Sequence, residues 1–252
     1  MHTTTQWEFA AYLRADTECR PYAVILLNQP LDSRHWPLLW TRAQVRLCAD
    51  GGINSLYDAT ACASHSIPGA VYPEFLCGDM DSALAPVVAW FEAKGVEVCR
   101  IADQNSTDFE KCIRRLEHWE HEHCLTESPV SLMPIIVLGA LSGRFDHCMH
   151  AINVLHKQRS ARRIYLMSEA SVAFLLDEGE HTIHVDRSLE GPTCGLLPVG
   201  IAHATLSTTG LRWNLDGADT RFGGMVSTSN ALDQDTVTIS TTAPLIWTVA
   251  LQ

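Results

Sequence analysis

Two aspartates, separated by one residue, stand in the segment GDMDS at residues 78–82. The segment follows the apolar run at residues 75–77, which predicts a short buried strand. Mg²⁺ takes oxygen ligands in proteins, often one or two carboxylates together with the phosphates of a substrate. Asp79 and Asp81 therefore predict a metal–phosphate site at the end of this strand. The plain alternative is that D-x-D arises by chance in an acidic chain.

A second segment, DQNSTDFEK at residues 103–111, places Asp108 and Lys111 three residues apart on one helix face. Asn105, Ser106 or Thr107 could cap that helix. The free N–H groups of a helix start favour anions, so Asp108 could hold a metal while the amides face phosphate. Alternatively, Lys111 is an ordinary ion-pair partner of Asp108 within the helix.

A third segment, GALSGRFDH at residues 139–147, follows an apolar run and opens a predicted helix. That is where a phosphate-binding turn is expected, although the segment is neither a P-loop nor G-x-G-x-x-G. Arg144 offers a planar fork of donors for phosphate oxygens. Asp146 could orient Arg144, bind metal or accept a proton. A tight turn with a helix cap is the alternative.

The elements that must position these segments alternate between strand and helix. Strands are predicted at residues 24–27, 45–49, 75–77, 96–101, 135–138 and 164–167. Helices are predicted at 86–94, 108–119 and 145–158, and another could run from a cap at Asp32 or Ser33 toward Arg42. This alternation is typical of a parallel sheet covered by helices. Ligands of such sheets bind at the carboxyl ends of the strands, so we expect Asp50, Asp79 and Gly139 at one edge.

After Leu176 the pattern changes to short β-like runs separated by Gly, Pro and Asp. Residues 236–240, for example, alternate with the period of a half-buried strand. We therefore predict an α/β nucleotide-binding domain over residues 1–170, followed by an all-β sandwich domain over residues 171–252.

The composition of the 252 residues narrows the class of protein. The formal net charge of -11 argues against a nucleic-acid-binding protein. No apolar run reaches the roughly 20 residues that span a bilayer, and the first residues do not resemble a signal peptide. The 9 cysteines form no C-x-x-C pair. Free thiols in a reducing compartment are therefore expected, and we place the protein in the cytoplasm.

Taken in order, these motifs resemble those of the thiamine pyrophosphokinase family. The resemblance rests on DGGIN at 50–54, the three segments above, LLPVG at 196–200, TTGLRWNL at 208–215 and STSN at 227–230. It covers roughly residues 22–252 and is stronger toward the eukaryotic branch of the family. Animal members carry an aromatic residue shortly after the S-x-S-N segment, where this chain has Ala231 and Leu232.

The resemblance implies transfer of a diphosphate group from ATP to the hydroxyl of thiamine, giving AMP and thiamine diphosphate. It implies Mg²⁺ held by Asp79, Asp81 and Asp108, and catalytic roles for Arg144 and Asp146. It also implies a homodimer with shared active sites. The residues implied to contact ATP or thiamine are Asp50, Gly51, Gln104, Thr107, Lys111, Trp213, Ser227, Ser229 and Asn230.

Two other classes stay open at this point: another Mg²⁺-dependent D-x-D nucleotide transferase, and a non-catalytic sensor of nucleotide or thiamine. The presence of Asp79, Asp81, Asp108 and Asp146 favours an enzyme. Diphosphoryl transfer depends more on neutralising the charge of the phosphates than on covalent catalysis by the protein. Either Asp108 or Asp146 could accept the proton of the attacking hydroxyl.

Overall fold

The computed structural model describes residues 4–31, 34–61, 71–123 and 132–252. Its backbone contacts divide the chain into two compact units. One unit, here called the α/β unit, comprises Arg20–Val154 and Ser160–Ser168. The other, here called the β unit, comprises Met1–Cys19, Leu155–Arg159 and Glu169–Gln252.

The α/β unit is built on six parallel strands. They are β2 (Ala23–Leu26), β3 (Val45–Ala49), β4 (Phe75–Gly78), β5 (Glu97–Arg100), β6 (Ile135–Leu138) and β7 (Ile164–Met167). Their spatial order is β7-β6-β2-β3-β4-β5. All except β5 are buried along their whole length, as strands covered on both faces must be.

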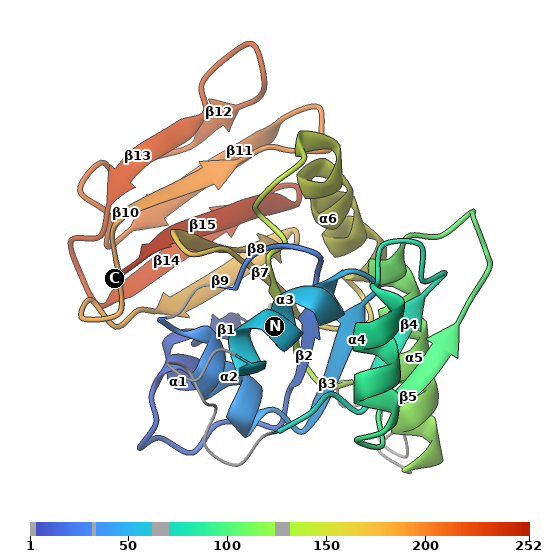
Figure 1. Ribbon diagram of the computed structural model, residues 1–252. Helices are drawn as coiled ribbons and strands as arrows, with labels where there is room; N and C mark the ends of the chain where they lie inside the picture. The colour runs from blue at the N-terminus through green and yellow to red at the C-terminus, as the bar shows by residue number, and fades with distance from the viewer. Residues whose placement is uncertain (1–3, 32–33, 62–70, 124–131) are drawn as a thin grey trace. The chain divides into compact units, whose positions relative to one another are not determined.

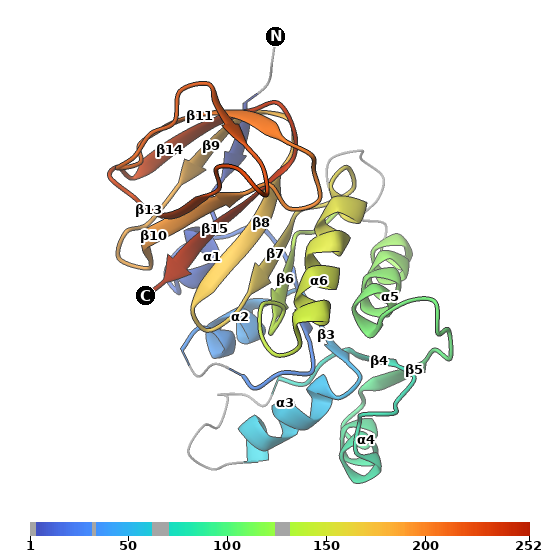
Figure 2. The same cartoon turned by 90° about the horizontal axis from the view of Figure 1, so that it is seen from above.

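Helices follow the strands of this unit. They are α2 (Trp36–Arg42), α3 (Gly52–Ala61), α4 (Ala85–Glu92), α5 (Asp108–Glu122) and α6 (Phe145–Gln158). The chain moves outward from β2 through β3 and β4 to β5, then returns to the other side of β2 for β6 and β7. Accordingly, α2, α3 and α4 lie on one face of the strands, and α5 and the start of α6 lie on the other (Figure 2). The order reverses between β2 and β6, which is where ligand crevices of open α/β sheets form.

Helix α5 shows how local sequence sets an element. Thr107 is its N-cap and forms a capping box with Glu110, so two backbone N–H groups of the first turn have partners. Phe109, Cys112, Ile113 and Leu116 are buried and recur at the spacing of one helix face. That face packs on β3 and β4, which fixes the first turn of α5 above the strand ends.

The β unit contains two groups of strands, which overlap in Figure 1 and are seen as two layers in Figure 2. The first has the order β1-β9-β14-β11-β12, with bounds Thr5–Trp7, Gly179–His184, Thr236–Thr241, Ala204–Thr209 and Ala218–Thr220. The second has the order β13-β10-β15-β8, with bounds Ser227–Ala231, Glu190–Leu197, Leu245–Leu251 and Ser171–Leu176. Trp7 of β1 stacks on Phe174 of β8 with ring centroids 4.6 Å apart, so side chains from both layers share one core.

The predicted fold class is confirmed, because helices cover a parallel sheet in one unit and the second half of the chain is β-rich. Five elements were not predicted: α3, β8, β12, the N-terminal strand β1 and the short helix that follows it. The helix cap expected at Asp32 or Ser33 lies outside the described residues. β1 pairs in parallel with β9, and the short helix α1 (Ala10–Leu13) follows it. The start of the chain thus packs with the β unit. The proposed division at residue 170 stays a prediction.

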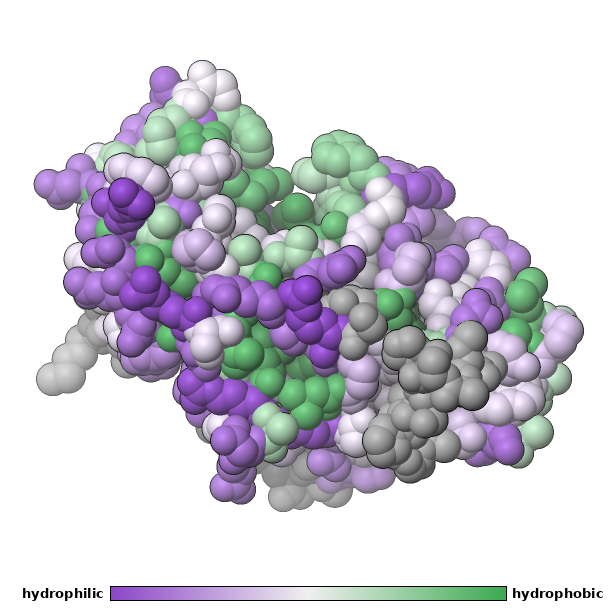
Figure 3. Space-filling view, turned by 60° about the vertical axis from the view of Figure 1, so that its left-hand side comes forward, coloured by the Kyte–Doolittle hydropathy of each residue, from purple (hydrophilic) through white to green (hydrophobic). Residues whose placement is uncertain are grey.

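The helices, the surface and the cysteines can be compared with the expectation of a protein without membrane spans or a disulfide framework. Within the described residues, no helix is both long and apolar enough to cross a membrane. One face carries hydrophilic side chains with separate, smaller hydrophobic patches between them (Figure 3). Among the residues that the structure describes, free thiols include Cys48, Cys77, Cys99, Cys112, Cys148 and Cys194.

Candidate active site

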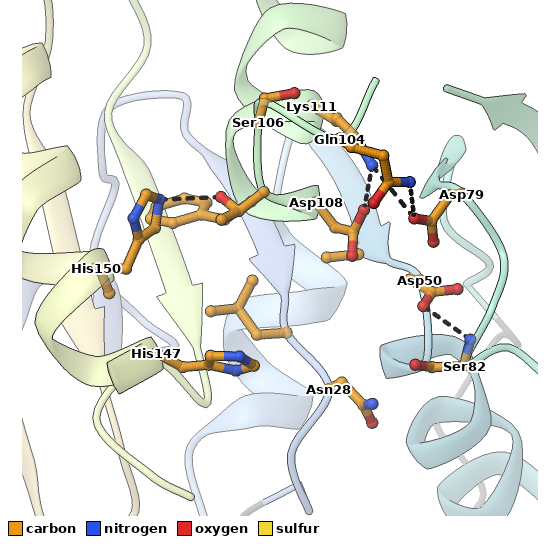
Figure 4. Close-up of a pocket in the computed structure, with 15 residues that line it drawn as sticks. Asn28, Asp50, Asp79, Ser82, Gln104, Ser106, Asp108, Lys111, His147 and His150 are labelled. Carbon is orange, nitrogen blue, oxygen red and sulfur yellow. Dashed lines mark hydrogen bonds and ion pairs between the residues drawn. The ribbon is translucent and has the colours of Figure 1, made fainter. Parts of the chain in front are cut away.

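A pocket of about 300 Å³ opens at the carboxyl ends of the strands in the α/β unit. Its walls come from the residues that follow β2, β3, β4 and β5 and from the first turns of α5 and α6 (Figure 4). The lining residues are Leu27, Asn28, Ala49, Asp50, Asp79, Ser82, Gln104, Ser106, Thr107, Asp108, Phe109, Lys111, His147, His150 and Ala151.

Three carboxylates converge in this pocket. Asp50, Asp79 and Asp108 each offer an oxygen, and these oxygens all lie within 4.8 Å of one another. They follow β3 and β4 and begin α5, so three separate elements supply them. Gly78 allows the close approach, because a Cβ at this position would lie 2.8 Å from Cβ of Asp50. Such a cluster of oxygens suits a hard divalent cation.

Asp50 is the buried member of the triad, with only 3% of its surface exposed. Its carboxylate accepts hydrogen bonds from the backbone N–H groups of Ser82 (3.0 Å) and Ala83 (3.2 Å). Burial raises its pKa, the hydrogen bond with the Asp81 carboxyl raises it further, and the backbone donors only partly offset these effects. Asp50 therefore sits where a cation would stabilise its charged form.

The loop after β4 is folded over Asp50 by Asn54 of α3. The Asn54 amide donates to the carbonyl of Ser82 at 2.9 Å and accepts from the N–H of Leu84 at 3.0 Å. Asp81 lies within this loop with an exposed side chain that accepts from the Ser82 hydroxyl at 2.8 Å. Asp81 is thus beside Asp50 but is not a member of the triad.

Lys111 supplies the positive charge of the pocket. Its ammonium lies 2.9 Å from Asp108 Oδ1 and 4.0 Å from Asp79 Oδ2, and its side chain is 2% exposed. Burial lowers the pKa of Lys111, but the hydrogen bond and the charge of Asp108, together with the charge of Asp79, outweigh that effect and leave it raised. Lys111 therefore stays charged in the pocket.

Gln104 orients the second carboxylate. Its Nε2 donates to Asp79 Oδ2 at 3.0 Å, and this bond is the main reason that the pKa of Asp79 is lowered. Asp79 is consequently an anion at neutral pH. Asp79 lines the pocket together with Asp50, Gln104, Thr107 and the Asp108–Lys111 pair.

The glycine-rich segment after β6 lies beside Gln29. Gly139 and Gly143 have φ angles of +82° and +75°, and a Cβ at Gly139 would lie 2.8 Å from Cβ of Gln29. Arg144 donates to Asp146 through Nε at 3.1 Å and Nη2 at 2.5 Å. Both side chains are exposed, and neither is among the residues that line the pocket. Asp146 has a lowered pKa because of Arg144.

Two histidines in the pocket were not among the predicted site residues. His147 and His150 come from the first two turns of α6 and line the wall next to α5 (Figure 4). The sequence signal was their three-residue spacing at the start of a helix that follows a strand. That spacing is also common for surface residues, so it does not identify a site without the fold.

In the β unit, Asn230 organises the predicted thiamine-contact residues. Its buried side chain accepts from the N–H of Trp213 at 3.2 Å and donates to the carbonyl of Trp213 at 2.9 Å. Trp213 itself is 57% exposed. Ser227 is buried, whereas Ser229 is exposed with a φ of +56°. The side chain of Asn230 therefore holds the backbone of Trp213, while the indole remains accessible.

Comparisons with known proteins identify the family of this chain. Residues 36–167 match the model of the thiamin pyrophosphokinase catalytic domain, and residues 180–246 match that of the thiamin pyrophosphokinase vitamin B1 binding domain. Thiamine pyrophosphokinase 1 of Oryza sativa subsp. japonica is 40% identical over 248 residues, which cover 94% of this chain and 90% of that protein. The chain belongs to the thiamine pyrophosphokinase family. A second member, thiamine pyrophosphokinase 1 of Arabidopsis thaliana, is 37% identical over 92% of this chain and 86% of its own length.

A solved structure supports the same fold. The yeast thiamin pyrophosphokinase crystal structure superposes with a TM-score of 0.84 at 24% identity, covering 98% of this chain and 91% of that one. The catalytic-domain match of the thiamine pyrophosphokinase family contains every lining residue of the pocket except Leu27 and Asn28. The vitamin B1 binding match contains Trp213 and the segment at residues 227–230.

Proposed function

We propose that this protein transfers the diphosphoryl group of ATP to the hydroxyl of thiamine, releasing AMP and thiamine diphosphate. The observation that carries the proposal is the pocket at the strand ends, where three carboxylates converge and a buried ammonium lies beside two of them. A nucleotide transferase needs such charges to hold a polyphosphate and its metal. Membership of the thiamine pyrophosphokinase family selects thiamine as the acceptor.

Mg²⁺ fits the donor set of this pocket. The carboxylate oxygens of Asp50, Asp79 and Asp108, which lie within 4.8 Å of one another, are hard ligands. We propose that Asp79 and Asp108, together with Asp81 from the neighbouring loop, are the metal ligands. Asp50 is directed at the same centre. When bound, the ion would neutralise charge on the transferring phosphates. Lys111 would add a fixed positive charge beside them, and the start of α5 would offer its N–H groups.

The remaining residues of the pocket have supporting roles in this proposal. Gln104 holds Asp79 in one orientation. Arg144 has the donor fork for a phosphate group, and Asp146 keeps it oriented until substrate arrives. Either Asp108 or Asp146 accepts the proton of the thiamine hydroxyl.

We propose that thiamine binds in the β unit beside Trp213 and the strand β13, which carries Asn230. The exposed indole of Trp213 suits a cationic thiazolium, and Ser227, Ser229 and Asn230 offer polar groups near it. The phosphate-handling residues and these thiamine-contact residues lie on different units. We propose a homodimer in which two chains share each site. We also propose that the enzyme works in the cytoplasm.

The test is to incubate the protein with ATP, Mg²⁺ and thiamine and to quantify all nucleotides and thiamine esters. We expect AMP and thiamine diphosphate in equal amounts, and neither product when thiamine or Mg²⁺ is omitted. ADP formation that does not depend on thiamine would refute the proposal. Tight binding without turnover would favour the sensor, and turnover with a sugar phosphate acceptor would favour another D-x-D transferase.

A further inference from the structure

We propose that His150 is a positioning residue, which holds the first turn of α5, and with it Asp108 and Lys111, in the geometry that turnover requires. The inference rests on the proposed function, since it assigns a role in that same site. His150 belongs to α6, a different element from the one whose start it contacts.

The contact is made at the capping box of α5. Nε2 of His150 lies 3.0 Å from Thr107 Oγ1 and 3.3 Å from Glu110 Oε2. Thr107 and Glu110 are the two side chains that close the first turn. Asp108 stands between them in the chain, and Lys111 follows Glu110. The histidine therefore touches the cap that fixes both charged residues.

The hydrogen bonds of the Thr107 hydroxyl indicate which ring nitrogen of His150 carries the proton. This hydroxyl donates to Glu110 Oε2 at 3.2 Å and accepts from the N–H of Glu110 at 3.4 Å. One acceptor position remains for the His150 ring. A proton on Nε2 lets the ring donate to the hydroxyl and face the Glu110 carboxylate favourably. A bare Nε2 lone pair would instead face that carboxylate oxygen at 3.3 Å, which is unfavourable.

The consequence is that α6 supports the cap of α5 through a donated N–H. Without that donor, the capping box would keep its own two bonds but lose its tie to α6. Small shifts of a helix start matter here, because a displacement of about 1 Å in a positioned group can lower turnover about a hundredfold. Asp108 and Lys111 would be the residues displaced.

Three substitutions of His150 separate positioning from simple packing. The amide nitrogen of Gln reaches about as far from the backbone as Nε2, so His150→Gln keeps the donor. Asn is one carbon shorter, and His150→Asn places its nitrogen too far back, while His150→Ala removes the donor. The control is His121→Ala, an exposed histidine at the far end of α5.

We expect His150→Ala and His150→Asn to lower kcat about tenfold, the factor for one lost hydrogen bond to a charged network, and to raise the Mg²⁺ concentration for half-maximal activity. His150→Gln should restore both values to within about threefold of wild type. The proposal would be overturned if all three substitutions changed only the melting temperature, and to the same extent, while kcat stayed at the wild-type value. Wild-type Mg²⁺ dependence in His150→Ala would also overturn it.

A second readout does not depend on activity. Amide hydrogen exchange at Glu110 and Lys111, followed by NMR, should be faster in His150→Ala and His150→Asn than in wild type, and normal in His150→Gln. Unchanged exchange in His150→Ala would refute the positioning role even if activity falls. If the wild-type protein makes no thiamine diphosphate, the proposed function fails, while this measurement still decides whether His150 holds the helix start.

Discussion

The ammonium of Lys111 lies 2.9 Å from Asp108 Oδ1 and 4.0 Å from Asp79 Oδ2, with its side chain 2% exposed. A buried cation beside two carboxylates compensates their mutual repulsion. Lys111→Met would leave three carboxylates within 4.8 Å and no buried counter-charge. We expect its melting temperature in EDTA to fall by several degrees and to recover more strongly on Mg²⁺ addition than that of wild type.

Calorimetry with and without Mg²⁺ checks this prediction for Lys111. Lys157→Met, which changes an exposed lysine at the end of α6, is the control for loss of a positive charge. An equal loss of stability in EDTA and in Mg²⁺ would show that Lys111 acts through packing alone.

Replacement of the acidic residues tests the metal site. Asp79→Asn, Asp108→Asn and Asp81→Asn each keep size but remove a charge, and we expect each to lower turnover at least about a hundredfold. Initial rates over a range of Mg²⁺ concentrations are the measurement, with Asp58→Asn on an exposed site of α3 as control. Asp81 has the sharpest test, because it stands outside the triad. Near-normal rates in Asp81→Asn would restrict the site to Asp50, Asp79 and Asp108.

Arg144 and Asp146 form a bidentate pair that is exposed on both sides. Such a pair contributes little to stability, so Arg144→Lys should leave the melting temperature nearly unchanged. It should raise the KM for ATP while the KM for thiamine stays the same, since lysine keeps the charge but loses the fork. Steady-state kinetics with each substrate varied gives the answer. Arg100→Lys, in an exposed pair with Glu92, is the control, and a shift confined to melting temperature would contradict a phosphate contact.

Glu190 predicts a pH dependence of stability in the β unit. It is 2% exposed, and burial raises its pKa to about 7. Between the unfolded value and about 7, the folded protein keeps a proton that the unfolded chain has lost, so wild-type stability should fall as pH rises through this range. Glu190→Gln cannot lose that proton and should gain up to about 3 kcal/mol relative to wild type between pH 5 and pH 8.

Urea unfolding of both proteins at pH 5 and pH 8 measures this difference. The comparison cancels the titration of the other groups that the two proteins share. Parallel pH profiles for wild type and Glu190→Gln would show that Glu190 titrates at its ordinary pKa in the folded protein.

A subunit-mixing experiment tests the shared site. Asp79→Asn should abolish the binding of phosphate and metal. Asn230→Ala should release the backbone of Trp213, which the Asn230 side chain holds with two hydrogen bonds. If two chains build each site, mixed dimers carry both lesions in one site and leave the other intact. Activity should then return to about one quarter of wild type after random exchange. Full exchange without recovery, with both parents folded and dimeric, would place each site within one chain.

The sequence by itself determined the elements whose signals are local. An apolar run of four residues predicts a buried strand, and β6 and β7 begin and end where such runs do. The helix α6 likewise has its predicted bounds. Proximity of Asp50 and Asp79 was also predictable, because parallel strands expose their carboxyl ends at one edge. The capping signal at Asn105, Ser106 or Thr107 left the N-cap residue of α5 undecided, and the structure selects Thr107.

Tertiary structure decided what depends on contacts between distant segments. The strand β1 has a parallel partner more than 170 residues away in β9, and no pattern within its three residues names that partner. Likewise, the burial of Lys111, the membership of Asp50 in the triad and the contact of His150 with the cap of α5 each join separate elements. Hydrophobic periodicity shows which face of an element is buried but not what covers it, so these relationships exist only once the sheet is assembled.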